Sequence, residues 1–218
     1  MAVTSIIESR VETTRTALYV VGLTVAGIGI AGLLQAHLGT DPYDAINAAI
    51  ALKTGILVGT VSWINSAIVL AGAWALGRRP KIGTILLALG VGLVINLGMH
   101  LIPAPHSIGV RCLMAAASLA LLYLGVTGFV LSDRGAGCLE ELMLAIVARG
   151  GRIHRTRWGI EAVLLVIALV LQGPINVVTV IFVILTGPVL AGTLPALATL
   201  CRVPLPHHDP NVPLGDIR

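Results

Sequence analysis

The stretch HLGTDPYDAINAAIALKTG, residues 37–55, lies between two long apolar segments and determines how the chain is arranged. It carries a proline, two aspartates and a lysine, which are costly in a segment that faces lipid tails. Asp41 can cap a helix, the proline after it suits the first helical position, and Lys53 followed by Gly55 is typical of a helix end. The stretch therefore predicts a short helix over residues 42–53, about 18 Å long, which is roughly half the thickness of a bilayer.

The composition indicates a membrane protein. Of the 218 residues, 56% are hydrophobic and only 11% are charged, whereas an ordinary soluble domain carries roughly 25% charged residues. The apolar runs do not alternate with polar residues as the strands of a membrane β-barrel do. We therefore expect an all-α polytopic membrane protein. Six transmembrane helices are predicted, over residues 17–38, 56–76, 82–102, 112–131, 156–171 and 175–200.

The basic residues indicate how the chain is oriented. If the N-terminus is cytoplasmic and there are six spans, twelve of the 14 lysines and arginines lie on the cytoplasmic side, and only Lys53 and Arg111 lie outside. The sequence thus predicts a protein of the bacterial cytoplasmic membrane with both termini cytoplasmic. Residues 1–16 form the N-terminal segment and residues 201–218 a disordered tail. Because topology explains the net charge of +4, no nucleic-acid partner is expected.

The chain contains an internal repeat with an offset of 96 positions, in which residues 17–102 match residues 103–200. The matched pairs include Gly29 and Gly125, Gly32 and Gly128, Gly39 and Gly135, Asp44 and Glu140, Lys53 and Arg149, and Gly55 and Gly151. Each copy holds three predicted spans and one short segment. Because three is an odd number, the second copy enters the bilayer from the opposite face. The pattern predicts two inverted three-helix repeats, as in many secondary transporters.

Two interpretations of the short segments remain open. The counterpart of the opening stretch is GAGCLEELMLAIVARGG, residues 135–151. Each segment either lies flat at the membrane surface, or enters the membrane as a half-helix whose end faces protein or a watery cavity. Two half-helices from opposite faces would direct their N-terminal N–H groups toward the midplane and favour an anion. The carboxylates near those ends, Asp41, Asp44, Glu140 and Glu141, favour a cation or a protonatable solute instead, so the sign of the charge stays open.

Other polar residues interrupt the apolar runs. Glu161 lies in the fifth span, where a carboxylate is costly enough to suggest a function, although an ion pair with Arg157 one turn earlier explains it as well. Hydrogen bonds between helices are the alternative role for the polar residues of the other spans. The candidate residues of a substrate pathway are Asp41, Asp44, Asn65, Asn96, His100, Glu140 and Glu161. They form neither a metal cluster nor a catalytic pair, so we expect no cofactor, no metal and no enzymatic activity.

Several glycines and prolines have expected structural roles. The motif GIGIAG, residues 27–32, satisfies the dinucleotide pattern GxGxxG, but it lies inside a span and follows no strand. Small residues in such a span more often let helices pack closely. The residues with an expected structural role are Gly29, Gly32, Gly39, Pro42, Gly55, Gly125, Gly128, Gly135, Gly151 and Pro188. Pro188 is expected to kink the last span.

Residues 20–197 resemble the YczE/YyaS/YitT group of bacterial integral membrane proteins, in particular its YczE branch. The resemblance rests on the LG-x-x-P-x-D element at residues 38–44, on Gly83 with Thr84, on Arg157 with Glu161, and on the final Gly187 and Pro188. In the second half the chain reads GAGCLEE where the group usually has G-x-GPRD. The resemblance implies a multi-span membrane protein. Members are linked to regulation of secondary-metabolite synthesis or to undefined transport, and no substrate follows.

The leading hypothesis is a small-solute transporter or channel-like protein in the lipid bilayer, with a pathway between the two halves. The alternative is a non-transporting accessory or regulatory protein that binds a protein partner on its cytoplasmic face, where five arginines lie between residues 132 and 157. A homodimer is also compatible with the sequence. A third possibility, the solute-binding subunit of an importer driven by an ATPase, fits the size of the chain but not the inverted repeat.

Overall fold

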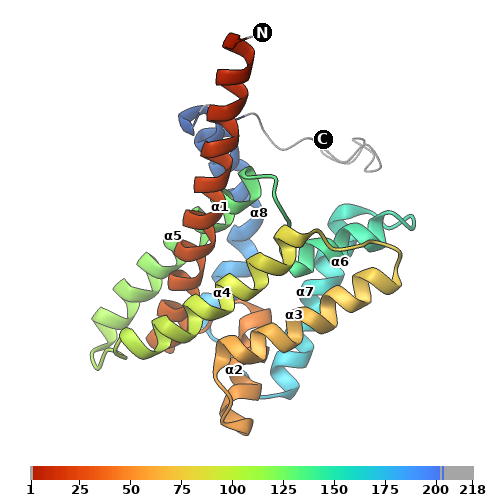
Figure 1. Ribbon diagram of the computed structural model, residues 1–218. Coiled ribbons are helices and arrows are strands. Elements are labelled where there is room, and N and C mark those ends of the chain that lie inside the picture. The colour runs from red at the N-terminus through yellow and green to blue at the C-terminus, as the bar shows by residue number, and fades with distance from the viewer. Residues whose placement is uncertain (1, 202, 204–218) are drawn as a thin grey trace.

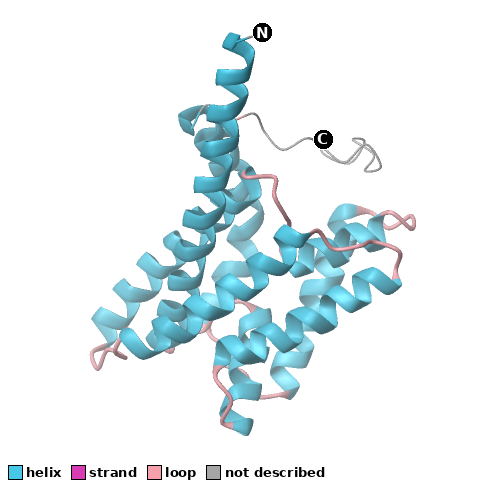
Figure 2. Ribbon diagram, viewed as in Figure 1, coloured by secondary structure: helices cyan, strands magenta, loops and turns pink. Residues whose placement is uncertain are grey.

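A computed structural model describes residues 2–201 and 203, and this part of the chain contains only helices and loops (Figure 2). The predicted all-α class is thereby confirmed. The eight helices of this part are α1 (Ala2–Ala36), α2 (Pro42–Thr54), α3 (Val58–Ala75), α4 (Ile82–Leu101), α5 (Ile108–Leu131), α6 (Cys138–Val147), α7 (Ile153–Val170) and α8 (Val177–Cys201) (Figure 1). The predicted disordered tail falls on residues 202 and 204–218, which lie outside the described residues, apart from its first and third positions.

A helix occupies each of the six predicted spans, but the helices differ in how well they suit a membrane. By length and composition, α1, α3, α4 and α5 can cross a bilayer. Helix α8 joins them only if its two parts, Val177–Thr186 and Pro188–Cys201, count as one span bent by 46°. The bend falls at a proline, which lacks the N–H group that would continue the helical hydrogen bonds. Helix α7 carries Arg155, Arg157 and Glu161 within its 18 residues and is not among the helices that are long and apolar enough to cross a bilayer.

The first helix is longer than the sequence predicts. The predicted span begins at residue 17, whereas α1 is continuous from Ala2. Threonine hydroxyl groups in this extension bond back to the carbonyl four residues earlier, for example Thr13 to Ser9 and Thr16 to Glu12, both at 2.9 Å. These bonds satisfy the threonine hydroxyl groups within the helix itself.

The two short helices start and end differently. Before α2, the carboxylate of Asp41 accepts the backbone N–H groups of Tyr43 at 3.1 Å and Asp44 at 3.2 Å. After it, Gly55 takes the left-handed conformation, with φ of 74°, and donates to the carbonyl of Ala51. Helix α6 begins after Gly137, which has no side chain to cap it. The N–H groups at the start of α6 therefore lack the carboxylate cap that those of α2 have.

Helices α1 and α5 pack against each other through glycines. A Cβ atom at Gly29 would lie 2.7 Å from the backbone N of Leu122, and a Cβ atom at Gly125 would lie 2.7 Å from the Cα of Ala26. These two contacts are equivalent in the repeat, because Gly29 matches Gly125 and Ala26 matches Leu122 at the offset of 96 positions. Farther toward the start of α1, Gly22 meets the backbone near Phe129, so the two helices run antiparallel. Small residues let the two backbones approach this closely.

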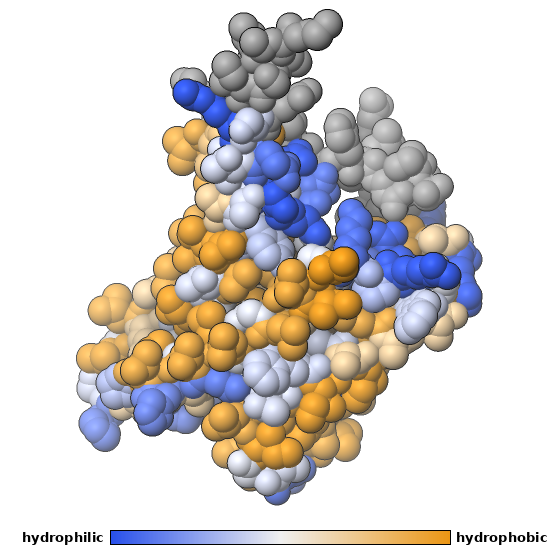
Figure 3. Space-filling view, viewed as in Figure 1, coloured by the Kyte–Doolittle hydropathy of each residue, from blue (hydrophilic) through white to orange (hydrophobic). Residues whose placement is uncertain are grey.

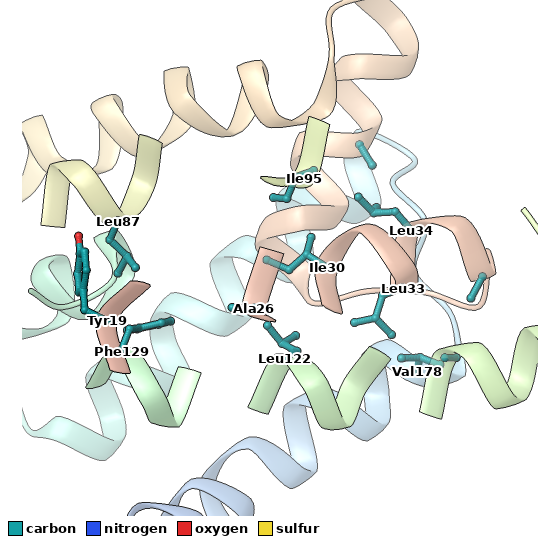
Figure 4. Close-up of a cluster of buried hydrophobic side chains, with 13 residues drawn as sticks. Tyr19, Ala26, Ile30, Leu33, Leu34, Leu87, Ile95, Leu122, Phe129 and Val178 are labelled. Atoms are coloured by element: carbon teal, nitrogen blue, oxygen red, sulfur yellow. The ribbon is translucent and has the colours of Figure 1, made fainter. Parts of the chain in front are cut away.

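The hydrophobic core lies around this contact and extends to α4 and α8 (Figure 4). Tyr19, Ala26 and Ile30 of α1 face Leu122 and Phe129 of α5. The other labelled members are Leu33, Leu34, Leu87, Ile95 and Val178. The first helices of the two halves therefore form the centre of the molecule.

Polar contacts join α1 to α5, or to the loop after α5, near both ends of α1. Near the start of α1, Arg134 of the α5–α6 loop pairs with Glu12. Near the end of α1, Arg111 donates to the carbonyl oxygens of Ala36 at 2.7 Å and His37 at 2.8 Å. The guanidinium thus satisfies carbonyl groups that the helix end leaves free. These contacts place the end of α5 beside the start of α1, and the start of α5 beside its end.

Large apolar side chains are exposed on the outside of the helices. Figure 3 shows hydrophobic residues over most of the visible face, with hydrophilic residues toward the N-terminal end of α1 and at the edges. Exposed examples are Ile64, Ile68, Leu93, Val166 and Val170. A soluble monomer rarely exposes such continuous apolar surface, whereas a membrane protein presents it to lipid.

Candidate functional site

A cavity of about 180 Å³ lies between the two halves of the chain. All eight described helices, or the residue that caps them, contribute to its lining. The polar part consists of Asp41, Tyr43, Asp44, Ser62, Ser66, Tyr123, Cys138, Glu140, Arg157, Glu161 and Thr186. The rest is apolar and comes mostly from α1, α4, α5 and α8. A concave, mostly apolar space with a few convergent polar groups is the usual form of a ligand site.

The first turns of both short helices meet at this cavity. The hydroxyl group of Tyr43, in the first turn of α2, lies 2.9 Å from the Oγ of Ser66. The Ser66 hydroxyl lies 3.7 Å from the sulfur of Cys138, the first residue of α6. Ser66 is the ninth of the 18 residues of α3. The two helix starts therefore converge halfway along a helix that is long enough to cross a membrane.

From this meeting point the short helices run apart. Thr54, at the end of α2, is followed by a three-residue loop and then by the start of α3 at Val58. On α6, by contrast, Leu142 packs near Gly72, close to the end of α3. One short helix thus follows α3 back toward its start, and the other follows it toward its end.

Asp41 and Asp44 form the acidic wall of the cavity at α2. Asp41 caps the helix, and Asp44 is 4% exposed and accepts the side-chain amide of Asn47 at 3.1 Å. The two carboxyl groups lie side by side at the start of α2 and line the same cavity. This wall can therefore hold a proton or attract a cation.

On the other side of the cavity, Arg157 links two carboxylates. Its guanidinium lies 2.9 Å from the carboxylate of Glu140, at the start of α6, and 2.9 Å from the carboxylate of Glu161, one turn along α7. The ion pair considered for Glu161 in the sequence is thus present, and the pair also lines the cavity. Asp41 and Glu161 line the same cavity. Four of the seven candidate residues, Asp41, Asp44, Glu140 and Glu161, come together here.

The other three candidates lie outside the lining of this cavity. The side-chain amide of Asn65 donates to that of Asn47 at 2.6 Å, and Asn47 in turn donates to the carboxylate of Asp44. Asn65 therefore positions Asp44 through Asn47. Asn96 accepts the backbone N–H of Gly59 at 2.7 Å, which satisfies a donor that the start of α3 leaves free. His100 is exposed in the last turn of α4.

The cavity is also lined by residues that were not predicted for the pathway: Tyr43, Ser66, Cys138 and Arg157. One signal was available, because Ser62 and Ser66 lie four residues apart in a largely apolar span and therefore share one helix face. The position of Cys138 beside Ser66 carries no such signal, because 72 residues separate the two in the chain.

The glycines with an expected structural role lie mostly at close contacts. Besides those between α1 and α5, a Cβ atom at Gly135 would lie 2.5 Å from the backbone N of Thr84. Gly39 has φ of 102°, and its Cβ atom would lie 2.8 Å from the Oγ1 of Thr179. The remaining ones are Gly32 and Gly128 at the α1–α5 contact, Gly151 near Thr156, Gly55 and Pro42 at the ends of α2, and Pro188 at the bend of α8.

The packing of the short helices is reciprocal between the halves. Helix α2 packs on α7, and α6 packs on α3, so each short helix contacts the third helix of the other half as well as its own. Two more contacts are equivalent in the repeat, that of Gly39 with Thr179 and that of Gly135 with Thr84. Gly39 matches Gly135 at an offset of 96 positions, and Thr84 matches Thr179 at an offset of 95.

Comparison with known proteins agrees with the resemblance to the YczE/YyaS/YitT group. The chain is 29% identical over 180 residues to "Uncharacterized membrane protein YczE" of Bacillus subtilis (strain 168), which covers 81% of this chain and 84% of that protein. It is 27% identical over 177 residues to "Uncharacterized protein YyaS" of the same organism, covering 79% of this chain and 88% of that protein. An "Uncharacterized protein" of Haemophilus influenzae is 25% identical over 183 residues, or 84% of either chain.

No solved structure matches this chain. The model of the family described as "Family of unknown function (DUF6198)" matches residues 13–193, which include all of α2 to α7 and the cavity between the halves. Together with the apolar helices, these matches identify a membrane protein, and the chain belongs to the DUF6198 family.

Proposed function

We propose that this protein is a small-solute transporter or channel-like protein, and that the cavity between α2 and α6 is the midpoint of its pathway. The convergence of the first turns of both short helices on one polar cavity is the observation that carries this proposal. Polar groups at this depth are costly in lipid and are retained where they line a solute path. Transporter sites of this kind lie at the interface of two repeats.

The proposed architecture is two inverted repeats of three spans each. Helices α7 and α8 supply the fifth and sixth spans, and α7 is the more polar because it faces the cavity with Arg157 and Glu161. Three observations support inversion. The two short helices begin 96 positions apart, at Pro42 and Cys138, the equivalent helices α1 and α5 run antiparallel, and each short helix packs on the opposite half.

The short helices are proposed to enter the membrane rather than lie on its surface. With 13 and 10 residues they are about 20 and 15 Å long, too short to cross a core about 30 Å thick. A helix that lies flat at the surface would not bring its first turn to the middle of α3. Backbone ends at this depth need polar partners, which Asp41 supplies for α2 and the cavity supplies for α6.

The proposed location is the bacterial cytoplasmic membrane, with both termini in the cytoplasm. In this orientation the loops that join α3 to α4, α5 to α6 and α6 to α7 are cytoplasmic and carry six of the 14 lysines and arginines. Lys53, at the end of α2, then lies near the outer face, and Arg149, just after α6, lies near the inner face.

Solute flux into proteoliposomes tests the proposal. Stopped-flow light scattering would compare a neutral solute such as urea, a cation such as tetramethylammonium and an anion such as formate. We expect the wild type to accelerate the flux of at least one of them over protein-free liposomes. Asp44→Asn and Glu161→Gln should alter that flux, whereas Asp133→Asn, outside the cavity lining, should not. Flux equal to that of protein-free liposomes for all three solutes would contradict transport.

The alternative is a non-transporting protein that binds a partner on the cytoplasmic face. The exposed arginines Arg149, Arg152 and Arg155 around the start of α7 support it, since they offer a basic docking surface. A stoichiometric acidic partner recovered by pull-down, with no flux of any solute, would favour this function.

A further inference from the structure

We infer that the cavity binds a small organic cation, with its ammonium group between Asp41 and the aromatic side chains of the lining. This inference rests on the proposed pathway, because it assigns the class of solute that passes through it. It depends on three features of the cavity: its aromatic residues, its carboxylates and its size.

Aromatic side chains are concentrated at this cavity. The chain has only two phenylalanines, three tyrosines and three tryptophans, yet Phe129, Phe182, Tyr43 and Tyr123 all line this one space. The rings of Tyr123 and Phe182 are stacked, with centroids 5.8 Å apart. Aliphatic residues, which dominate the chain, would suffice for a merely apolar wall. The faces of aromatic rings attract cations, and recognition of ammonium groups by such rings is their specific use.

The charges of the lining leave a place for a cation. Four carboxyl groups face one guanidinium, and Arg157 is already engaged by Glu140 and Glu161. Within the described part of the chain, the groups that bond to Asp41 and Asp44 are backbone N–H groups, the side chains of Thr40 and Asn47, and each other's carboxyl groups, and none of these is cationic. The N-terminus of a helix contributes only about half of a positive charge. An entering cation can therefore pair with Asp41 and Asp44, which have no cationic partner among the lining residues, whereas an anion is repelled.

The size of the cavity limits the solute. Its volume of about 180 Å³ lies below the roughly 300–1,000 Å³ of sites for drug-sized ligands. A small ammonium compound fits such a space.

Binding of radiolabelled choline to the full-length protein in lipid nanodiscs tests this inference. The competitors are tetramethylammonium, the neutral isostere 3,3-dimethylbutan-1-ol and the anion 3,3-dimethylbutanoate. We expect tetramethylammonium to displace choline, and the neutral and anionic compounds to fail at the same concentration. Asp41→Asn should weaken choline binding at least tenfold. Asparagine caps a helix as well as aspartate does, so this variant should keep α2 intact.

Two further variants separate binding from folding. Phe182→Leu should weaken choline binding roughly fivefold through loss of the ring, and Asp133→Asn, which removes a carboxylate outside the cavity, should leave it unchanged. The melting temperature of each variant shows whether it is folded. The inference is wrong if the alcohol or the anion displaces choline as well as tetramethylammonium does, or if folded wild-type protein binds neither cation.

The same preparations distinguish this inference from the proposed function. Choline that binds without entering proteoliposomes would contradict transport and leave the cation site standing. Flux of urea or formate, without binding of choline, would contradict the cation class and leave transport standing.

Discussion

The hydroxyl group of Tyr43 lies 2.9 Å from the Oγ of Ser66, at the middle of α3. The same oxygen of Ser66 lies 3.7 Å from the sulfur of Cys138. One side chain of a membrane-length helix thus contacts the first turns of both short helices, although α2 and α6 begin 96 positions apart in the chain. The cavity and its acidic wall depend on this arrangement.

Choline binding should weaken as the pH falls. Protonation removes the charge of the Asp41 carboxyl, the group proposed to hold the ammonium. The other charged groups of the lining are Glu140, Glu161 and Arg157. Titrating choline affinity against pH in nanodiscs measures the effect. Asp41→Asn should flatten the profile, whereas Glu161→Gln should keep its slope on the acid side. An affinity of folded wild type that does not change with pH would contradict the role of Asp41.

Gly29→Ala should destabilise the contact between α1 and α5. The added methyl group would lie 2.7 Å from the backbone N of Leu122, which cannot move without shifting α5. Overpacking of this kind costs about 1–3 kcal/mol. The matched control is Gly159→Ala on α7, whose methyl group would meet nothing within 4 Å and should be neutral or stabilising, because alanine favours a helix over glycine by roughly 1 kcal/mol. Thermal unfolding compares the two, and equal shifts in melting temperature would argue against the close approach of α1 and α5.

Glu141→Gln should lower the free energy of unfolding more than Glu12→Gln. Glu141 is 2% exposed and pairs with Arg78 at 2.5 Å, next to the hydroxyl group of Thr84. Breaking a fully buried pair costs roughly 3–5 kcal/mol, and this pair should cost less because a quarter of the Arg78 side chain is exposed. The pair of Glu12 with Arg134 is largely exposed and is worth at most about 1 kcal/mol. Denaturant unfolding of both variants measures the difference, and an equal loss would show that Glu141 is not held in a buried pair.

The helices could be predicted from the sequence because their signals are local. Long apolar runs marked the positions of the six long helices, and Asp41, Pro42 and Gly55 marked the limits of α2. The predicted span begins at residue 17 because residues 9–16 are mostly polar and charged, and an apolar run does not show that the helix extends back to Ala2. The marginal character of α7 also follows from its residues, since Arg157 and Glu161 face the cavity rather than lipid.

The site could be predicted only in part, because it depends on contacts between distant segments. Unusual carboxylates in apolar surroundings pointed to Asp44 and Glu161, which do line the cavity. The same rule selected Asn96, which instead holds the start of α3 through Gly59. Polarity alone does not distinguish a side chain that satisfies a backbone group from one that faces a cavity. The pairing of Arg157 with Glu140 links two helices across a turn and has no sequence signal of its own.

The labelling of two cysteine variants from each side of the membrane tests most directly whether the short helices enter from opposite faces. Lys53→Cys, at the end of α2, and Arg149→Cys, just after α6, are made separately in full-length protein whose Cys112, Cys138 and Cys201 are replaced by serine. A membrane-impermeant maleimide is added to right-side-out and inside-out vesicles. Lys53→Cys should react only in right-side-out vesicles and Arg149→Cys only in inside-out vesicles. Reaction of both from the same side would contradict the inverted arrangement and the pathway built on it.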